Sequence, residues 1–237
     1  MARTCIFCRA PATEAEHVIP AWVPKHLALE RELMSHDTAM GLPRAKHVRV
    51  DDYKAKVVCG KCHKLITNRI EAPASELLKE MMTGKARLLT VEEQRLLAAW
   101  GAKTAATSWG RTQKRRGVPL AHRRYLIERA EAHPSVFVGF CRCDGGSVRV
   151  VHGRTNIVLH DTGERLFVYH FELAFGTLGV KVYGPGDGRK RLAYKDMTSL
   201  LARVAPPGGE VKRWPPGRVL DWEAFSDLRD LDVRAGR

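Results

Sequence analysis

In the middle of the chain, apolar residues recur every three to four positions. This spacing predicts three helices, in "ASELLKEMM" (74–82), "TVEEQRLLAAWGAKTAATSWG" (90–110) and "PLAHRRYLIERAEA" (119–132). Thr90 precedes Glu93 by three residues, which is typical of a capping box and places the start of the longest helix there. We therefore expect a helical middle segment.

From residue 135 onward the spacing of apolar residues approaches two. Short runs with this alternation are "SVFVGFCRC", "SVRVVHG", "TNIVLHD", "RLFVYHFELAFG" and "LGVKVYG". They predict an antiparallel, meander-like sheet, with hairpin turns at "CDGGS" and "HDTGE". The later "RWPPGRVLDWEAF" predicts an extended segment that packs its Trp residues on the body and ends in a short helix.

The first third of the chain lacks a long periodic segment. In "EAEHVIPAW" a short strand is expected to end near Pro20 and turn into a loop. The predicted fold class is α+β, in three parts. They are a metal-binding module (1–72), a helical basic segment (73–133) and a β-rich carboxy-terminal domain (134–237).

The net charge of the chain indicates what kind of partner it binds. The 237 residues include 40 Lys and Arg against 26 Asp and Glu, a formal charge of +14. Because residues 111–127 carry six of these basic side chains and no acid, we expect nucleic acid, and DNA first, to be the partner. The candidate contacts are Lys61, Lys64, Lys114, Arg115, Arg116, Arg123 and Arg124.

Targeting signals are missing from the sequence pattern. The start, "MARTCIFC", has no apolar signal region, and no apolar run reaches the ~18 residues of a membrane span. We therefore expect a cytoplasmic protein with no membrane contact. In a reducing compartment its six cysteines are expected to be thiols or metal ligands.

Cysteine spacing is the most specific signal in the chain. Cys5 and Cys8 form one C-x2-C unit, and Cys59 and Cys62 form another. Two such units can supply the four thiolates of a tetrahedral structural zinc site, which leaves no open position for a substrate. The alternative is four unrelated buried thiols, which would need two coincident spacings.

Titratable residues lie beside both cysteine pairs. Glu16 and His17 follow the first pair, and His63 directly follows Cys62. If zinc joins the pairs, His63 approaches Glu16 and His17. We expect two imidazoles and a carboxylate that can hold a divalent ion and activate water.

At these residues the sequence resembles the HNH endonucleases, which have a ββα-metal fold. The segments that carry the resemblance are "EHVIP" and "VCGKCHK", and the closest likeness is to a bacterial and phage subgroup with C-x2-C before "EHVxPxW" and a second C-x2-C afterwards. "CHKLITNRIE" (62–71) matches the subgroup's later segment, so the resemblance covers residues 5–71. It implies an amino-terminal ββα module and hydrolysis of DNA phosphodiester bonds.

The resemblance also implies roles for three residues. His17 would be the general base that takes a proton from the attacking water. Glu16 and His63 would hold a catalytic Mg²⁺, Mn²⁺ or other divalent ion. The Zn²⁺ held by the cysteines would serve folding only.

The sequence departs from the family pattern in two places. The family's Asn, which orients the general-base His, has no counterpart, because no Asn lies between His17 and Asn68. His63 stands where the subgroup often has Asn, and an imidazole is the better transition-metal ligand. The missing Asn keeps a second hypothesis open: a catalytically inactive, nuclease-derived protein that binds zinc and nucleic acid. A third, an RNA-acting or protein-binding adaptor from phage or plasmid biology, is disfavoured, because no aromatic RNA-binding signature is present.

Cys141 and Cys143 form a C-x-C unit within a predicted strand, so both thiols should point to one face. A second zinc site with His152 or His170 is one interpretation. Plain buried thiols are the other, and the one we favour.

Overall fold

The computed structural model describes residues 3–27, 32–37, 44–50, 53–112, 117–144, 148–158, 163–187, 192–193, 200–206, 208–227 and 234–235. In chain order the elements are β1 (Glu14–His17), α1 (Trp22–Leu27), β2 (Glu32–Asp37), β3 (Arg44–Arg49), β4 (Lys54–Val58), α2 (Gly60–Ile66), the π-helical turn η2 (Thr67–Glu71), α3 (Ala72–Met82), β5 (Arg87–Leu89), α4 (Val91–Thr112), α5 (Leu120–Arg129), β6 (Phe137–Cys143), β7 (Val148–Val158), β8 (Arg165–Phe175), β9 (Leu178–Pro185), β10 (Leu192–Ala193), β11 (Ala202–Ala205), β12 (Lys212–Trp214), β13 (Val219–Leu220), α6 (Trp222–Asp227) and β14 (Arg234–Ala235).

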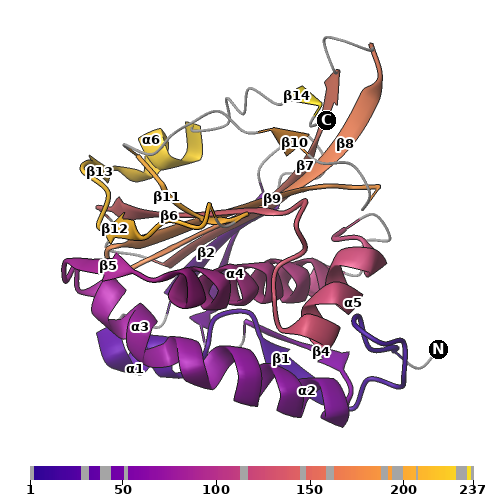
Figure 1. Cartoon of the computed structure of the whole chain (residues 1–237). Helices are drawn as coiled ribbons and strands as arrows, with labels where there is room; N and C mark the ends of the chain where they lie inside the picture. Colours follow the sequence, from indigo (N-terminus) through magenta and orange to yellow (C-terminus); the bar gives the residue numbers. More distant parts are fainter. Residues whose placement is uncertain are drawn as a thin grey trace.

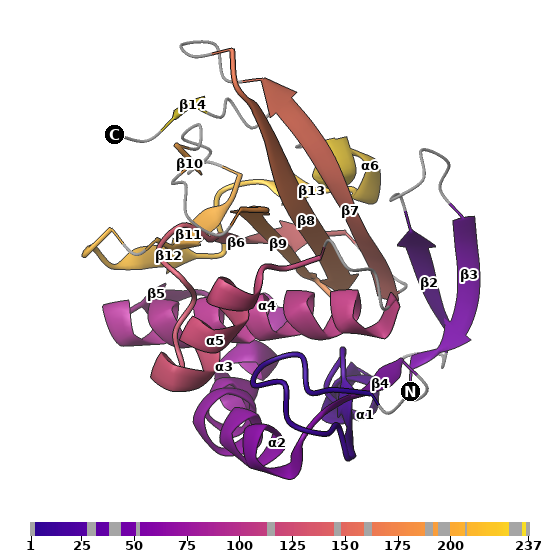
Figure 2. The ribbon, with the colours of Figure 1, turned by 90° about the vertical axis from the view of Figure 1, so that its right-hand side faces the viewer.

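The long helix α4 lies in the middle of the molecule. A large sheet built around β6–β9 covers one side of it, and β1, β4, α2 and α3 lie on the other side (Figure 1). Seen from the side, β2 and β3 extend the sheet next to β7 (Figure 2). The mixture of helices with an antiparallel sheet confirms the coarse α+β expectation.

The three helices predicted in the middle segment are present as α3, α4 and α5. The capping box is also present at the start of α4. The Glu93 N–H donates to Thr90 Oγ1 at 3.2 Å, and the Thr90 N–H donates to Glu93 Oε2 at 2.9 Å. Two backbone donors that the helix cannot pair internally are thereby satisfied.

The sheet confirms the antiparallel expectation but corrects two details. Strands β7, β8 and β9 form a meander, and β6 pairs with β9 on its far side. The predicted hairpin at "CDGGS" is wrong, because β6 and β7, which flank this segment, are not neighbours in the sheet. Residues 148–153 of "SVRVVHG" and residues 155–158 of "TNIVLHD" lie in the single strand β7, which runs through Gly153.

Strands β2 and β3 have no counterpart in our sequence predictions. They form an antiparallel pair between the two cysteine units, and β2 pairs in parallel with β7. The region 1–72 therefore contributes two strands to the sheet of the region 134–237. In the same way, β12 pairs with β5 of the region 73–133, so main-chain hydrogen bonds cross both predicted boundaries.

Two glycines allow α4 to approach its neighbours closely on both sides. A Cβ at Gly101 would lie 2.8 Å from Val138 Cγ1 on β6, and one at Gly110 would lie 3.1 Å from Ile6 Cδ1 in the first cysteine turn. The two residues are nine positions apart, so they lie on opposite faces of the helix. Trp100, fully buried, packs on Phe140 and Phe175 of the sheet.

The carboxy-terminal segment contributes to two apolar clusters. Trp214 is fully buried in the cluster that also contains Trp100 of α4, whereas Phe225 of α6 packs with Cys141 and Cys143 of β6 in a second cluster. Both observations agree with the expected extended segment and short helix. Among the described residues, no helix is long and apolar enough to cross a membrane.

Candidate metal centre and active site

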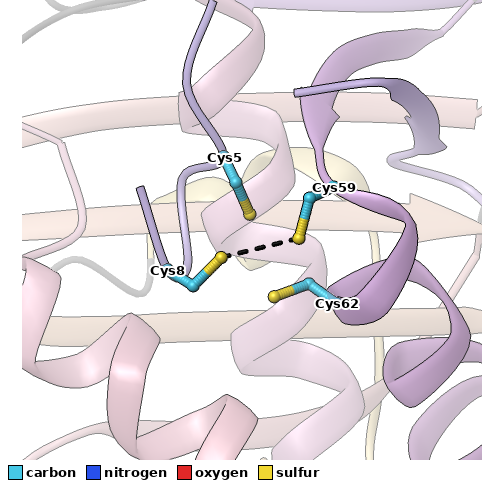
Figure 3. A group of neighbouring side chains, drawn as sticks. All are labelled: Cys5, Cys8, Cys59 and Cys62. Atoms are coloured by element: carbon cyan, nitrogen blue, oxygen red, sulfur yellow. Dashed lines mark hydrogen bonds between the residues drawn. The ribbon is translucent and has the colours of Figure 1, made fainter. Parts of the chain in front are cut away.

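Four cysteines that are far apart in the sequence meet in space. The Sγ atoms of Cys5, Cys8, Cys59 and Cys62 all lie within 4.8 Å of one another, and Cys8 Sγ lies 3.5 Å from Cys59 Sγ. Figure 3 shows the four sulfur atoms directed toward a common point. A tetrahedron with Zn–S bonds of ~2.3 Å has sulfur–sulfur edges of about 3.8 Å, so the cluster has the size that zinc requires.

Local backbone structure explains how each pair is aimed. In the first turn, Arg9 takes a left-handed conformation with a φ of 68°, and its N–H donates to Cys5 O at 2.9 Å. In the second, Cys59 is the N-cap of α2, and the His63 N–H donates to Cys59 O at 2.9 Å. Each turn therefore holds its two thiols on one side.

The cluster favours a thiolate at Cys59. Burial raises the pKa of this thiol, but hydrogen bonds from the Cys62 backbone and from the neighbouring thiols outweigh burial and lower it to about 7. Burial raises the pKa of Cys8 and Cys62 above the ordinary value, so four free thiolates do not coexist here without a cation. A bound divalent ion such as zinc would supply the missing positive charge.

Arg123, predicted to contact nucleic acid, is used inside the protein. Its guanidinium donates to the carbonyl of Ile6 between Cys5 and Cys8, and to Val118 O at 2.9 Å. Burial lowers the pKa of this side chain. Arg123 therefore supports the first cysteine turn from α5, and these donors are not available to a phosphate.

The cysteine cluster positions a second group of polar residues. Strand β1 pairs antiparallel with β4, and α2 begins two residues after β4 ends. Glu16 of β1 is almost fully buried, and its Oε2 lies 3.7 Å from Nε2 of the half-exposed His63 on α2. The structure thus brings together Glu16 and His63, as the cysteine spacing predicts.

Glu16 has one occupied and one unoccupied oxygen. Its Oε1 lies 2.9 Å from the ammonium of Lys103, whereas the buried Oε2 has no hydrogen-bond partner among the described residues. A buried carboxylate oxygen without a donor is costly, and a cation is one of the few partners that can satisfy it. Two ligands bound at ~2.1 Å to one ion lie about 3 to 4 Å apart, so the Glu16–His63 distance fits a shared ion.

His17 lies next to this pair without joining it. It is the last residue of β1, opposite Lys54 in the β1–β4 register. Within the described residues, His17, Glu16 and His63 do not form a group of three ligand atoms of the kind the cysteines form. Burial lowers the pKa of the His17 imidazole, which keeps the ring neutral and able to accept a proton near pH 7.

Lys103 is the residue of this site that our sequence reasoning missed. It projects from α4, is fully buried, and contacts the carboxylates of Glu16 and Glu71 as well as the carbonyl of His17. Burial lowers the pKa of Lys103, but the two carboxylates outweigh burial and raise it. The signal was its position as a single charge within the apolar run "AAWGAKTAATSW" (98–109).

Glu71 reaches Lys103 from the end of the π-helical turn η2. The helix formed by α2, η2 and α3 runs from Gly60 to Met82, and the wide turn lies just before Pro73. Because proline has no N–H to donate to the preceding turn, a wider turn is favoured there.

Three of the remaining candidates for nucleic-acid contact are exposed on two helices. Lys61 and Lys64 are exposed on α2, and Arg124 is exposed on α5. Lys114, Arg115 and Arg116 lie outside the described residues.

The Cys141 and Cys143 thiols point to one face of β6, as predicted, with their Sγ atoms 3.5 Å apart. Both are buried among apolar side chains, and burial raises the pKa of Cys141 well above the ordinary value. The four-cysteine cluster is the single group of three or more potential ligands in the described residues, so His152 and His170 do not complete a second one.

Comparison of the chain with protein-family models, with curated proteins and with solved structures gave no match.

Proposed function

We propose that the chain is a metal-dependent endonuclease of the HNH type that hydrolyses DNA phosphodiester bonds. The observation that carries this proposal is the buried Glu16 Oε2, which has no hydrogen-bond partner in the described part of the chain and lies 3.7 Å from His63 Nε2. The order of elements supports it: an antiparallel β1–β4 pair is followed by a helix that bears His63. This order of elements supports the ββα module that the resemblance of residues 5–71 implies.

Charge in the site favours a cation. The carboxylates of Glu16 and Glu71 contribute two negative charges, and the Lys103 ammonium contributes one positive charge. One negative charge is left, and Glu16 Oε2 lies 3.7 Å from His63 Nε2. Glu16 and His63 would hold a divalent ion, which when bound neutralises charge on the scissile phosphate.

His17 would perform the proton transfer. Its lowered pKa leaves the imidazole unprotonated at neutral pH, so it can accept a proton from water as the water oxygen bonds to phosphorus. The bond from phosphorus to the 3′ oxygen then breaks, and that oxygen leaves with the electron pair. The exposed Lys61 and Lys64 on α2 are candidates to bind the flanking phosphates.

A second candidate is a catalytically inactive zinc protein that binds nucleic acid. The observation that favours it is the Lys103 ammonium, 2.9 Å from Glu16 Oε1. A positive charge this close repels an incoming divalent ion. The absence of the family's Asn points the same way.

Plasmid nicking distinguishes the two candidates. Zinc-loaded protein is incubated with supercoiled plasmid and Mg²⁺ or Mn²⁺, next to His17→Ala. His26→Ala, which changes an exposed imidazole on α1, is the matched control. Nicking by the wild type and by His26→Ala, but not by His17→Ala, supports the endonuclease.

If all three proteins bind DNA in a salt-dependent way and none of them nicks it, the inactive binder is supported instead. If the wild type neither binds nor cuts DNA, both candidates are wrong, and the adaptor hypothesis takes their place.

A further inference from the structure

We infer that Lys103 is a positioning residue that fixes both Glu16 and the backbone of His17 from the central helix α4. The inference rests on the proposed function, because it assigns Lys103 a role in the same site. The chain lacks the Asn that orients the general-base His in the family. Lys103, which lies outside the resembling segment, would instead hold the adjacent residues Glu16 and His17 in place.

The geometry around the ammonium carries the inference. A protonated lysine has three N–H donors and no acceptor. Lys103 Nζ has three acceptors: Glu16 Oε1 at 2.9 Å, His17 O at 2.9 Å, and Glu71 Oε1. Every donor is matched, so the ammonium has a single position and holds its partners in one arrangement.

The consequence for Glu16 is that its two oxygens have different roles. Oε1 is held by Lys103, and this orients Oε2 toward His63 Nε2. Glu16 can then offer one oxygen to an ion, not two. A residue that acts in this way on a ligand affects ion affinity without touching the ion.

The consequence for His17 concerns the backbone only. Lys103 binds its carbonyl at the last residue of β1, and the next residue, Val18, donates its N–H to Tyr53 O at 3.0 Å. The chain is thereby fixed on both sides of the point where the strand ends. The imidazole then projects from a defined backbone position.

Lys103 is itself well fixed, because α4 is packed on both faces. Gly101 and Trp100 contact the sheet, and Gly110 contacts the first cysteine turn. A long side chain that is fully buried has little rotamer freedom left to lose when the ion binds. The sheet thus serves as the rigid support of the site through a single helix.

The test is Mn²⁺ binding by the zinc-loaded, full-length protein, followed by electron paramagnetic resonance at mildly alkaline pH. The informative variant is Lys103→Met with Glu71→Gln, because it removes one positive and one negative charge and so leaves the net charge of the site unchanged. Val138→Ala, on the sheet side of α4, serves as the control for lower stability.

We expect the double variant to bind Mn²⁺ about 10- to 100-fold more weakly than the wild type, and Val138→Ala to bind it normally. The nicking kcat should fall with the KM for DNA unchanged, because positioning acts on the reacting groups. If the folded double variant binds Mn²⁺ as the wild type does, Lys103 is only structural and the inference is wrong. If the wild type binds no Mn²⁺ at all, the Glu16–His63 site and the proposed endonuclease are wrong as well.

A measurement on the wild type covers the case in which the double variant does not fold. The Lys103 ammonium, buried and fully hydrogen-bonded, should give a slowly exchanging ¹⁵Nζ signal in nuclear magnetic resonance. Glu16 contacts Lys103 through Oε1 and would bind the ion through Oε2. Mn²⁺ at Oε2 must therefore broaden the Lys103 signal before those of exposed lysines such as Lys61. If the Lys103 signal stays sharp while Mn²⁺ binds, the inference is overturned.

Discussion

The two faces of helix α4 are held by different kinds of contact. On the sheet side, Trp100 packs on Phe140 and Phe175, and Gly101 allows β6 to come close. On the side of the cysteine cluster, Lys103 reaches two carboxylates and a carbonyl. Apolar packing is non-directional, whereas an ammonium with three acceptors fixes specific atoms.

The difference indicates that the two faces of α4 have different roles. The sheet side buries large apolar side chains, which favours folding at roughly 25 cal/mol per Å² of apolar surface. The cluster side buries charge, which costs desolvation and is retained where position matters. We therefore expect changes on the sheet side to act mainly on stability, and changes on the cluster side to act on both stability and the candidate site.

Removal of zinc should give the largest effect and should separate the two sides. Structural zinc sites bind their ion with about 10 to 16 kcal/mol, much of which is folding free energy. A chelator should abolish hydrogen-exchange protection in residues 3–17 and 54–66, while β6–β9 keep theirs.

Zinc restored in excess should reverse this loss, and Cys141→Ala should behave as the wild type. If the sheet loses protection together with the cysteine region, the two sides of α4 form one cooperative unit and the comparison fails.

Lys103→Met should give the second largest effect, on the cluster side. Breaking a buried ion pair leaves uncompensated charge, here on Glu16 and Glu71, and costs about 3 to 5 kcal/mol. Urea denaturation of the zinc-loaded protein measures the loss. The double change Lys103→Met with Glu71→Gln should cost less, because one buried carboxylate rather than two is then without a cation. Equal losses for the single and the double variant would contradict this account of the charges.

Gly101→Ala tests the sheet side and should have a smaller effect. The added Cβ would lie 2.8 Å from Val138 Cγ1, and the overpacking cost of about 1 to 3 kcal/mol exceeds the gain of about 1 kcal/mol in helix propensity.

Gly110→Ala is the matched change on the other face, where the neighbour is the movable end of Ile6 at 3.1 Å. We expect Gly101→Ala to lower the urea midpoint and Gly110→Ala to leave it nearly unchanged. The reverse order would show that α4 is packed more tightly against the cysteine turn than against the sheet.

Local patterns explain how much of this could be predicted from the sequence. The capping box at Thr90 and Glu93 and the cysteine pairs act over a few residues or through a fixed spacing, so they can be recognised directly. The meeting of Glu16 with His63 followed from the cysteines, because zinc would join their neighbours in space.

The features that were missed depend on partners far along the chain. Strand β2 pairs with β7, more than a hundred residues later, and its sequence does not show a clear alternation. The segment "CDGGS" has the composition of a hairpin turn, but strand pairing elsewhere in the sheet separates β6 from β7. The role of Lys103 was missed because its partner Glu16 lies in another region of the chain, and the sequence shows only a single charge in an apolar run.

Thr90→Ala should have the smallest effect. It serves as a reference for changes on the sheet side and on the cluster side of α4, because the cap belongs to neither face. Loss of the Thr90 Oγ1 acceptor leaves the Glu93 N–H without its partner and costs about 1 kcal/mol, whereas Thr90→Ser keeps the hydroxyl and should cost almost nothing. Urea denaturation measures both variants.

Mn²⁺ affinity should be unchanged in each, because Lys103 lies more than three turns from the cap and is held by its own partners. If Thr90→Ala weakened Mn²⁺ binding as much as the double Lys103–Glu71 variant, general loosening of α4 would explain the effect of both, and Lys103 would have no separate role.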